Sequence, residues 1–429
     1  VRKWVRPLSQ FREELEKTQF VVTARNESCF ERCRALGTLC DRDWFDPLNS
    51  CATMVDVFGT ETRPVHCDET SHNRNLPALM GGDKVFVNSR PTQFSSSCGA
   101  VNDDGVRVCG CSKVDKGFLD RGDYHTVYNV QANKYFSWIV RYTDHWWKQT
   151  KARGRRTRLL SASAMDHLVD TPTHVAPNAA VPFDLGYTPY NKPLSIDHWL
   201  SNSRVEEEMI LIVDPDCAFA FPLEVPVQRG KPIANAPWFS FDETKTSSYN
   251  DVALRYCADC AFVDPIAVPI IIHREDLRLI APLWLEITKQ IRQDMLNKVL
   301  PKGEWESFLW WTAEMFGYIF AAAKLNIRHD IWPLQVIPQG AYMVSRRTPI
   351  MHFHTEVFVN GYQAHKGSWF KGFEDAAEVF PHPVPDDEIK HSGSAGKLKR
   401  TFFGMMAQAL QTLGPDTHNY SKGYRDVEV

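Results

Sequence analysis

The sequence contains no apolar run long enough to span a membrane, and its first residues, Val1-Arg2-Lys3-Trp4, have no signal-peptide pattern. Its net charge is only -3. A balance this close to neutral indicates neither a basic surface for nucleic acid nor an acidic tail. We therefore expect no nucleic-acid partner, and we expect any membrane anchor to lie outside this sequence.

Two kinds of metal motif are also missing. There is no His-Glu-x-x-His sequence, which argues against a metal-dependent hydrolase of that type. The early cysteines are irregularly spaced and lack the paired Cys-x₂-Cys knuckles of structural zinc sites. An even, crowded set in turn-rich sequence instead predicts disulfides formed in the secretory lumen, in the Golgi or endoplasmic reticulum. The eight early cysteines are Cys29, Cys33, Cys40, Cys51, Cys67, Cys98, Cys109 and Cys111.

The chain of 429 residues exceeds the size at which a single core usually keeps growing, so we expect more than one part. Composition predicts a stem or short helix over 1–20 and a cysteine-rich, disulfide-stapled module over 21–118. A larger α/β domain is expected over 119–385, followed by a peripheral C-terminal tail over 386–429. We expect the cysteine-rich module to be a cap packed on the larger domain rather than a separate binding unit.

The larger domain begins with alternating strand and helix patterns. Residues 124–130 and 157–161 predict strands on either side of an aromatic-rich helix over 135–147. Such a unit is parallel and right-handed, as at the start of a Rossmann-like sheet. The basic run 148–158 lies at the sheet edge opposite the ligand crevice, so we expect a solvated charge cluster there. Further strands are predicted at 230–234 and 264–272, and long helices at 277–294 and 305–324.

The candidate functional site of the larger domain is predicted around one stretch of the sequence, residues 209–216. The apolar run 209–213 predicts a buried strand, and it ends in Asp214-Pro215-Asp216. Ligands of open α/β sheets bind at the carboxyl ends of strands, and carboxylates are ligands for Mg²⁺ or Mn²⁺. An ordinary acidic turn is the alternative, because Pro and Asp both favour turns. Downstream, His352 and His354 alternate in a short apolar strand, so both imidazoles can share one face.

Several ordered motifs together resemble the plant and algal peptidyl glycosyltransferases, over about residues 124–373. Two branches fit, the hydroxyproline O-arabinosyltransferases and the peptidyl serine α-galactosyltransferases. The motifs are Val205 to Asp216, Asp264-Pro265-Ile266, Ala281-Pro282-Leu283-Trp284 and Trp311-x₂-Glu314-Met315-x-Gly317-Tyr318. The resemblance implies a GT-A type fold, a UDP-sugar donor, a divalent cation such as Mn²⁺, and transfer with retention of configuration.

The same resemblance implies roles for individual residues. Asp214 and Asp216 would hold the cation with His352, and His354 is the rival ligand. Glu314 and Asp264 are the catalytic candidates beside the acceptor and the sugar, and no covalent nucleophile is assigned. The donor-binding candidates are Thr126, Tyr128, Asn129, Asn191, Lys192, Asp214, Lys366, Gly367 and Trp369.

The acceptor implied by the resemblance is a hydroxyproline-rich or Ser-containing extended peptide. Such peptides favour the polyproline II form, which aromatic grooves recognise because it is already ordered. The candidate groove residues are Trp238, Phe239, Trp310, Trp311 and Trp369, although we expect most of them in the core.

The motifs favour an arabinosyltransferase, which would transfer L-arabinofuranose from a UDP-sugar to hydroxyproline. A serine galactosyltransferase using UDP-galactose is the nearest alternative. Three alternatives of other classes are a non-catalytic peptide- or carbohydrate-binding protein on a degenerate glycosyltransferase fold, a metal-dependent hydrolase, and a secreted interaction module.

Overall fold

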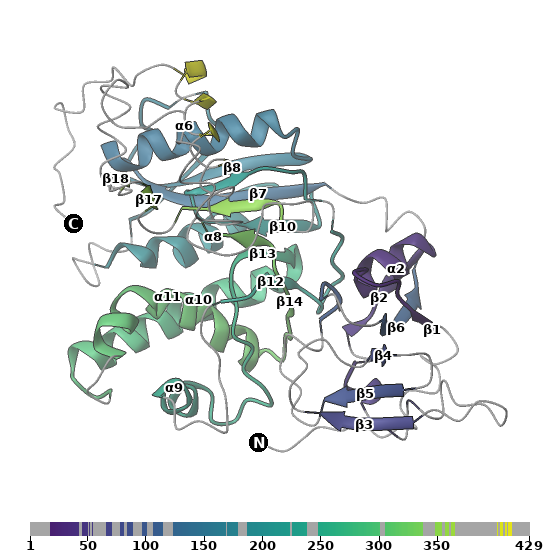
Figure 1. The fold of residues 1–429 in the computed structure, drawn as a ribbon. Helices are drawn as coiled ribbons and strands as arrows, with labels where there is room; N and C mark the ends of the chain where they lie inside the picture. The colour runs from purple at the N-terminus through teal and green to yellow at the C-terminus, as the bar shows by residue number, and fades with distance from the viewer. Residues whose placement is uncertain are drawn as a thin grey trace.

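A computed structural model of the chain shows a mixed α/β protein with a disulfide-rich N-terminal part (Figure 1). The structure describes residues 18–42, 45–49, 51, 54, 66–70, 78–80, 84–88, 97–100, 106–114, 123–168, 170–178, 187–223, 225–237, 248–300, 305–337, 348–353, 357–359, 362–364, 401, 404, 405, 408, 409 and 411–413. None of the helices within these ranges is long and apolar enough to cross a membrane.

A seven-stranded sheet with the order β14-β12-β13-β10-β7-β8-β9 forms the centre of the larger part. Strands β10, β7, β8 and β9 are parallel to one another, and α6 connects β7 to β8. The predicted parallel, Rossmann-like start of the sheet is therefore confirmed. The strands are β7 (Tyr124–Gln131), β8 (Gly154–Ser161), β9 (Thr173–Ala176), β10 (Met209–Ile212), β12 (Ile233–Asn235), β13 (Ala267–His273) and β14 (Asp330–Trp332).

Helices cover both faces of this sheet, with α6 on one face and α8, α10 and α11 on the other (Figure 1). Along β10, Ile210 and Ile212 pack in the core with α8, α10 and α11, whereas Leu211 packs in the core that includes α6. A strand buried on both faces needs the continuous apolar run seen in the sequence. The helices are α6 (Lys134–Gln149), α8 (Asn191–Asn202), α9 (Ser248–Cys257), α10 (Arg274–Leu296) and α11 (Trp305–Lys324), and the 3-10 helix η3 (Thr188–Tyr190) precedes α8.

The cysteine-rich part forms its own six-stranded sheet. Disulfides join Cys29 to Cys109, Cys33 to Cys111 and Cys40 to Cys98, which confirms the predicted disulfide framework. A further disulfide, Cys257–Cys260, lies outside this part and was not predicted. The elements are β1 (Thr18–Val22), α2 (Cys29–Ala35), β2 (Thr38–Cys40), α3 (Phe45–Leu48), β3 (His66–Thr70), β4 (Ala78–Met80), β5 (Lys84–Asn88) and β6 (Val106–Lys113).

This part packs against β14, the edge strand of the large sheet. The ring of Phe30 contacts that of Trp332 edge to face, with centroids 4.8 Å apart. The N–H of Cys98 donates to Asp330 Oδ2 over 3.2 Å. These contacts favour the interpretation of the module as a cap. The boundaries of the four predicted segments stay predictions.

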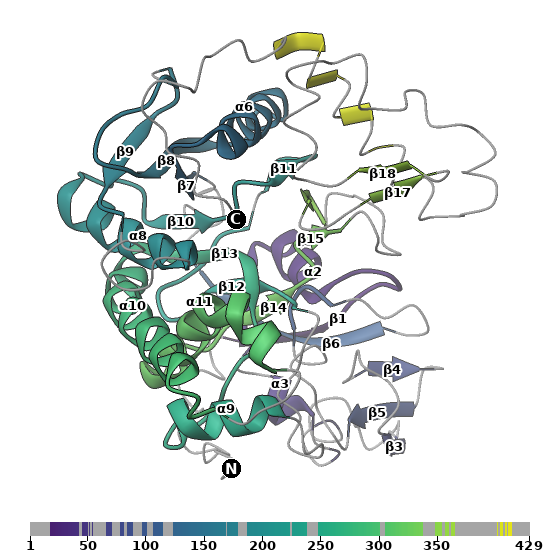
Figure 2. The same ribbon diagram turned by 90° about the vertical axis from the view of Figure 1, so that its left-hand side faces the viewer.

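A smaller three-stranded sheet continues from the end of β10, and Figure 2 shows its strands β11 and β15 beyond that end. Strand β16 pairs with β11 in antiparallel and with β15 in parallel orientation. The three strands are β11 (Cys217–Phe219), β15 (Gln335–Val336) and β16 (Ile350–His352), and β17 (Val357–Val359) pairs separately with β18 (Tyr362–Ala364).

The basic run differs in part from the prediction. Arg155 is exposed, as expected of a solvated cluster, but Arg156 and Arg158 are buried in ion pairs. Arg156 lies 2.6 Å from Asp144, and Arg158 lies 2.7 Å from Asp166. The run is partly strand β8, and Arg156 and Arg158, two residues apart, lie on the same face of the sheet, where they need buried partners.

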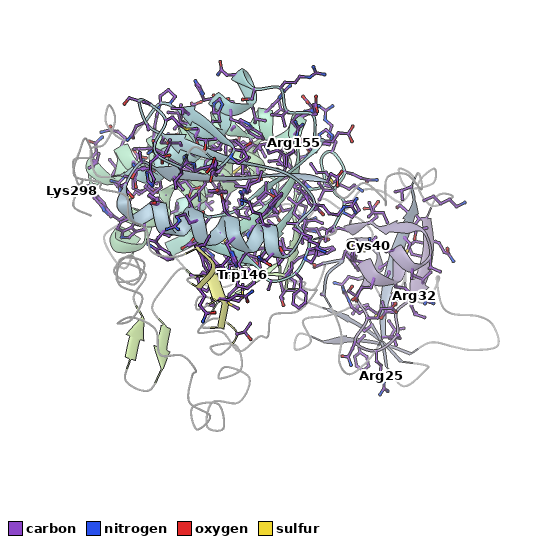
Figure 3. All side chains as sticks on the ribbon, turned by 90° about the horizontal axis from the view of Figure 1, so that it is seen from above. Arg25, Arg32, Cys40, Trp146, Arg155 and Lys298 are labelled. Carbon is purple, nitrogen blue, oxygen red and sulfur yellow. A yellow bond between two sulfur atoms is a disulfide. The ribbon has the colours of Figure 1, made fainter. Side chains whose placement is uncertain are left out.

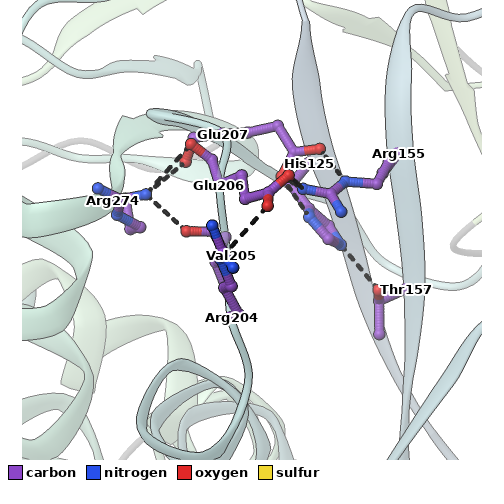
Figure 4. A network of polar contacts seen from close by, with 8 residues as sticks. All are labelled: His125, Arg155, Thr157, Arg204, Val205, Glu206, Glu207 and Arg274. Atoms are coloured by element: carbon purple, nitrogen blue, oxygen red, sulfur yellow. Dashed lines mark hydrogen bonds and ion pairs between the residues drawn. The ribbon is translucent and has the colours of Figure 1, made fainter.

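A polar network fastens the chain before β10 to the neighbouring strands (Figure 4). Glu207 Oε2 lies 2.9 Å from His125 Nδ1 and 3.0 Å from Arg155 Nη2. His125 Nε2 lies 2.7 Å from Thr157 Oγ1. Burial alone would raise the pKa of Glu207, but hydrogen bonds with Arg155 and His125 outweigh it and lower the pKa to about 2.

This lowered pKa predicts a pH-dependent contribution to stability. Because the pKa of Glu207 falls from 4.5 to about 2 on folding, the contribution is complete above pH 4.5 and is lost as the pH falls toward 2. We expect Glu207→Gln to lower the free energy of unfolding by roughly 1–2 kcal/mol at neutral pH, since half-exposed Arg155 is screened by water. Near pH 3 the loss should be clearly smaller.

Urea titrations at the two pH values measure this difference. The control is Glu286→Gln on the exposed face of α10, which should change little at either pH. An equal loss for Glu207→Gln at both pH values would contradict the assigned role.

Candidate active site

The Asp-Pro-Asp turn leaves the carboxyl end of β10 and is held in place by its neighbours. Val213 continues the pairing of β10 with β7 by donating its N–H to Val127 O over 3.1 Å. The N–H of Cys217 donates to Asp214 O over 3.1 Å, which closes the turn. Thr143 on α6 donates its hydroxyl to the carbonyl of Pro215. The two carboxylates therefore leave the sheet from a fixed backbone.

Strand pairing brings His352 to this turn. Cys217 on β11 and His352 on β16 are cross-strand partners, and the N–H of Phe353 donates to Asp216 O over 3.1 Å. His352 Nε2 lies 3.2 Å from Asp216 Oδ1 and 3.7 Å from Asp214 Oδ2. The structure thus brings together the three residues that the sequence proposes as metal ligands.

The orientation of the imidazole is set by Gln335 on β15. His352 Nδ1 lies 3.0 Å from Gln335 Oε1, so Nδ1 carries the proton that Gln335 accepts. The lone pair of Nε2 then faces the two aspartates. Gln335 is itself held in place by its backbone N–H, which donates to Asn235 Oδ1 over 3.1 Å. Metal-binding histidines are commonly oriented in this way by a partner on the other ring nitrogen.

The donor set fits a divalent cation. Ligand atoms of Asp216, Cys217 and His352 lie within 4.8 Å of one another, and all three residues are buried. Burial raises the pKa of the Cys217 thiol well above its usual value, so this sulfur stays protonated and is a poor ligand. Two carboxylates and one imidazole remain, a set that suits Mn²⁺.

Lys192, at the start of α8, connects this turn to α11. Its Nζ lies 2.7 Å from Asp214 Oδ1 and 3.2 Å from Glu314 Oε1. Burial alone would lower the pKa of Lys192, but the two carboxylates outweigh it and raise the pKa. Burial also raises the pKa of Glu314, and Lys192 offsets only part of that effect. The ammonium group of Lys192 therefore lies between the carboxylates of Asp214 and Glu314. Because its pKa is raised, Glu314 holds a proton more readily than an ordinary glutamate.

Glu314 is fixed through its backbone as well. Its N–H donates to Tyr187 Oη over 2.8 Å, and its carbonyl accepts from Trp284 Nε1 over 2.7 Å. One turn later, α11 approaches α10 so closely that a Cβ on Gly317 would lie 2.1 Å from Thr288 Oγ1. Only glycine permits this approach, which places Glu314 opposite Lys192.

Asp264 lies elsewhere. Strand β14 is separated from β10 by β12 and β13, and Asp264 makes its contacts beside β14. Asp264 Oδ2 accepts from the N–H of His329, just before β14, over 2.7 Å. Its Oδ1 lies 3.9 Å from both Arg42 and Arg328. This placement corrects the expectation that Asp264 lies beside the sugar.

Strand β7 holds three of the donor-binding candidates, and the structure places them on two different faces. Tyr128 is buried in the core with α6, where its hydroxyl donates to Asp144 Oδ1 over 2.7 Å, which corrects the expectation that it binds the donor. Thr126 is buried too, on the same strand face as Tyr128. Asn129 points to the opposite face and donates to Ser195 Oγ on α8 over 3.0 Å. The donor-binding roles of Asn129 and buried Asn191 stay predictions.

Four predicted site residues, His354, Lys366, Gly367 and Trp369, lie outside the described residues, as do Trp238 and Phe239. Sequence reasoning missed Gln335, Tyr187 and Trp284, which orient the site residues through hydrogen bonds. No motif marks Gln335 or Tyr187, because each acts on a residue far away in the sequence. Trp284 lies in the quoted Ala-Pro-Leu-Trp motif, which gives it a visible signal.

A substitution of Gln335 tests its role as the orienting partner. Gln335→Leu removes the acceptor for His352 Nδ1, and we expect Mn²⁺ binding to weaken by roughly 10- to 100-fold, as when an outer partner of a metal ligand is lost. Gln335→Glu keeps an acceptor and should bind the ion nearly as well as the original protein. Electron paramagnetic resonance of free Mn²⁺ measures the affinity, and thermal melts confirm folding. Unchanged affinity in Gln335→Leu would remove Gln335 from the site.

Comparison with known proteins shows which sequences and structures this chain is similar to. Residues 124–331 match the model of the hydroxyproline O-arabinosyltransferase family N-terminal domain. Peptidyl serine alpha-galactosyltransferase from Arabidopsis thaliana is 30% identical over 258 residues, which are 57% of this chain and 31% of that protein. Hydroxyproline O-arabinosyltransferase 3 from the same plant is 29% identical over 217 residues, which are 48% of this chain and 57% of that protein.

Hydroxyproline O-arabinosyltransferase NOD3 from Pisum sativum is 28% identical over 268 residues, 60% of this chain and 71% of that protein. The chain thus spans less than two thirds of the length of the first two relatives. Among solved structures, galactosyltransferase LgtC in complex with donor and acceptor sugar analogs gives a TM-score of 0.36 at 10% identity. The match covers 60% of this chain and 98% of that one.

Proposed function

We propose that the chain, whose residues 124–331 match the hydroxyproline O-arabinosyltransferase family model, is a metal-dependent peptidyl O-glycosyltransferase of GT-A type. The observation that carries the proposal is the convergence of Asp214, Asp216 and His352 at the carboxyl end of β10, with Lys192 and Glu314 alongside. A structural acidic turn would not need an oriented imidazole and a lysine paired with two carboxylates.

The proposed donor is a UDP-sugar. Asp214, Asp216 and His352 would hold a divalent cation, which neutralises the diphosphate of such a donor. Lys192 adds a fixed positive charge next to Asp214, and its raised pKa keeps it charged at neutral pH. A preorganised cation of this kind stabilises the negative charge that develops on a leaving diphosphate.

Glu314 is proposed to lie on the acceptor side of the sugar. As a carboxylate it can orient the acceptor hydroxyl, take its proton, or stabilise positive charge on the sugar in the transition state. Its raised pKa brings it closer to the pH at which a general base is most effective. Transfer with retention of configuration remains part of the family-based proposal, without an assigned nucleophile.

The proposed reaction is transfer of L-arabinofuranose to hydroxyproline in an extended, hydroxyproline-rich peptide. Transfer of galactose to serine is the second candidate, and the 30% identity to a serine galactosyltransferase favours it. The proposed compartment is the lumen of the secretory pathway, because the buried disulfides Cys29–Cys109 and Cys33–Cys111 form under oxidising conditions.

A donor and acceptor panel tests the proposal. UDP-arabinofuranose and UDP-galactose are each incubated with a hydroxyproline-rich peptide and with a Ser-containing peptide, with Mn²⁺ or with a chelator. We expect glycopeptide from one donor and acceptor pair, dependent on the cation. Absence of both glycopeptide and UDP release in every combination would overturn the proposed activity and leave a non-catalytic binding protein.

A further inference from the structure

An exposed apolar surface lies next to the proposed active site, where α10 ends and α11 begins. Its members are large hydrophobic side chains with about half their surface in water: Leu296 (48%), Val299 (49%), Trp310 (42%) and Trp311 (58%). We refer to these four residues as the α10–α11 apolar surface. Trp310 and Trp311 are neighbours in sequence near the start of α11, and adjoining exposed rings of this kind often mark an interaction site. We expected most of the five candidate groove residues in the core, but Trp310 and Trp311 lie at the surface.

We propose that the α10–α11 apolar surface binds the acceptor polypeptide, as an extended proline-type segment lying along Trp310 and Trp311. The inference rests on the proposed function, and it assigns the acceptor side of that same site. Three observations carry it: the stacking of the Trp310 ring on Arg292, the hydrogen bonds that link the backbones of Trp311 and Glu314 through Tyr187, and the position of the surface away from the cysteine-rich part.

Trp310 is held rigidly by stacking. The guanidinium carbon of Arg292 lies 3.9 Å from the centroid of the Trp310 ring and 4.2 Å from that of Tyr187. The same guanidinium donates to Trp310 O over 3.2 Å. A cation sandwiched between two rings fixes both of them, and the side of the Trp310 ring away from Arg292 is the part that can meet a ligand.

The backbones of Trp311 and Glu314 are linked by hydrogen bonds to the same hydroxyl group, that of Tyr187. Tyr187 Oη donates to Trp311 O over 3.1 Å and accepts from the N–H of Glu314 over 2.8 Å. Trp311 and Glu314 are three residues apart on α11, so their side chains are neighbours, with Cβ atoms about 5–6 Å apart. A peptide lying on the Trp311 ring would therefore have a residue within reach of Glu314.

The chemistry of the surface suits a polyproline II segment. Flat, fixed indole rings pack against pyrrolidine rings, and a peptide already in this form loses little entropy on binding. The cysteine-rich part, which is the other candidate for binding a peptide, lies away from this surface. Figure 3 shows Lys298, next to Val299, on the opposite side of the molecule from Arg25, Arg32 and Cys40.

Steady-state kinetics of Trp311→Ala test the proposal. We expect the KM for a proline- and hydroxyproline-rich peptide to rise roughly tenfold, as when one aromatic anchor is lost. The KM for the UDP-sugar and the slow hydrolysis of the donor without acceptor should stay unchanged. Trp311→Phe should recover most of the loss. The matched control is Leu279→Ala, which truncates another exposed apolar side chain on α10 and should change nothing.

A second measurement does not depend on transfer. A peptide of proline alone cannot accept sugar, and calorimetry should show that it binds the original protein more tightly than Trp311→Ala. An unchanged peptide KM in Trp311→Ala, or equal binding of the proline peptide, overturns the inference. Loss of a dimer in Trp311→Ala with unchanged peptide KM would assign the surface to self-association instead. If no sugar is transferred at all, the proposed function fails, while calorimetry still decides this inference.

Discussion

Replacing Asp216 by Asn is expected to lower kcat/KM by roughly a thousandfold, because a bound cation contributes several kcal/mol to stabilising a charged transition state. Asp216 lies 3.2 Å from His352 Nε2 and is buried, so its carboxylate is held next to the imidazole that would share the cation. The amide of Asn keeps the size of the side chain but lacks the negative charge that a hard cation requires. Mn²⁺ affinity should fall together with activity.

Kinetics and Mn²⁺ titration on the same preparations check this prediction. Asp170→Asn, at an exposed aspartate outside the site, is the matched control and should leave both quantities unchanged. The melting temperatures of the two variants should agree. Equal melting temperatures show that Asp216→Asn loses the ion and not the fold. Normal activity of Asp216→Asn in the presence of a chelator would refute the metal site.

Replacing Glu314 by Gln is expected to lower kcat by roughly 100- to 1000-fold, the range found when one preorganised charge in an active site is removed. The fold should persist, because Lys192 keeps its contact with Asp214 and the backbone of Glu314 keeps its bonds to Tyr187 and Trp284. The KM for the UDP-sugar should change little, since Glu314 is assigned to the acceptor side.

The pH dependence gives a second readout for Glu314. If its carboxylate acts as the base, activity rises as the pH increases through its raised pKa, and Glu314→Gln loses that rise. Glu286→Gln on the exposed face of α10 should keep the normal profile. A Glu314→Gln variant with full kcat and an unchanged profile would show that the Lys192–Glu314 pair is only structural.

The sequence predicted the long elements of the fold well, because each carries a repeated apolar pattern. The run that became β10 is continuous, as a strand buried on both faces requires, and the patterns over α10 and α11 extend for several turns. The early cysteines likewise predicted disulfides without revealing which pairs form. Pairing depends on how β6 returns to α2 and β2, and local sequence carries no record of that path.

The candidate site was predictable where its residues are close in sequence or follow a family motif, as with Asp214, Asp216 and His352. Contacts between segments that are distant in the sequence could not be predicted from it. Lys192 and Glu314 meet because α8 and α11 lie on the same face of the sheet, and Gln335 meets His352 because β15 pairs with β16. Asp264 shows the reverse error, since a motif residue can serve the packing between two parts rather than the reaction.

The contact between the cysteine-rich part and β14 has a practical consequence for producing the protein. Residues 330–332 meet that part on one side, and the chain then runs directly into β15, which carries the partner of His352. Cutting the chain near residue 119 would expose an aromatic ring and a buried carboxylate along an unprotected sheet edge. The truncated protein, or the uncut chain made in a reducing host, should therefore accumulate as inclusion bodies.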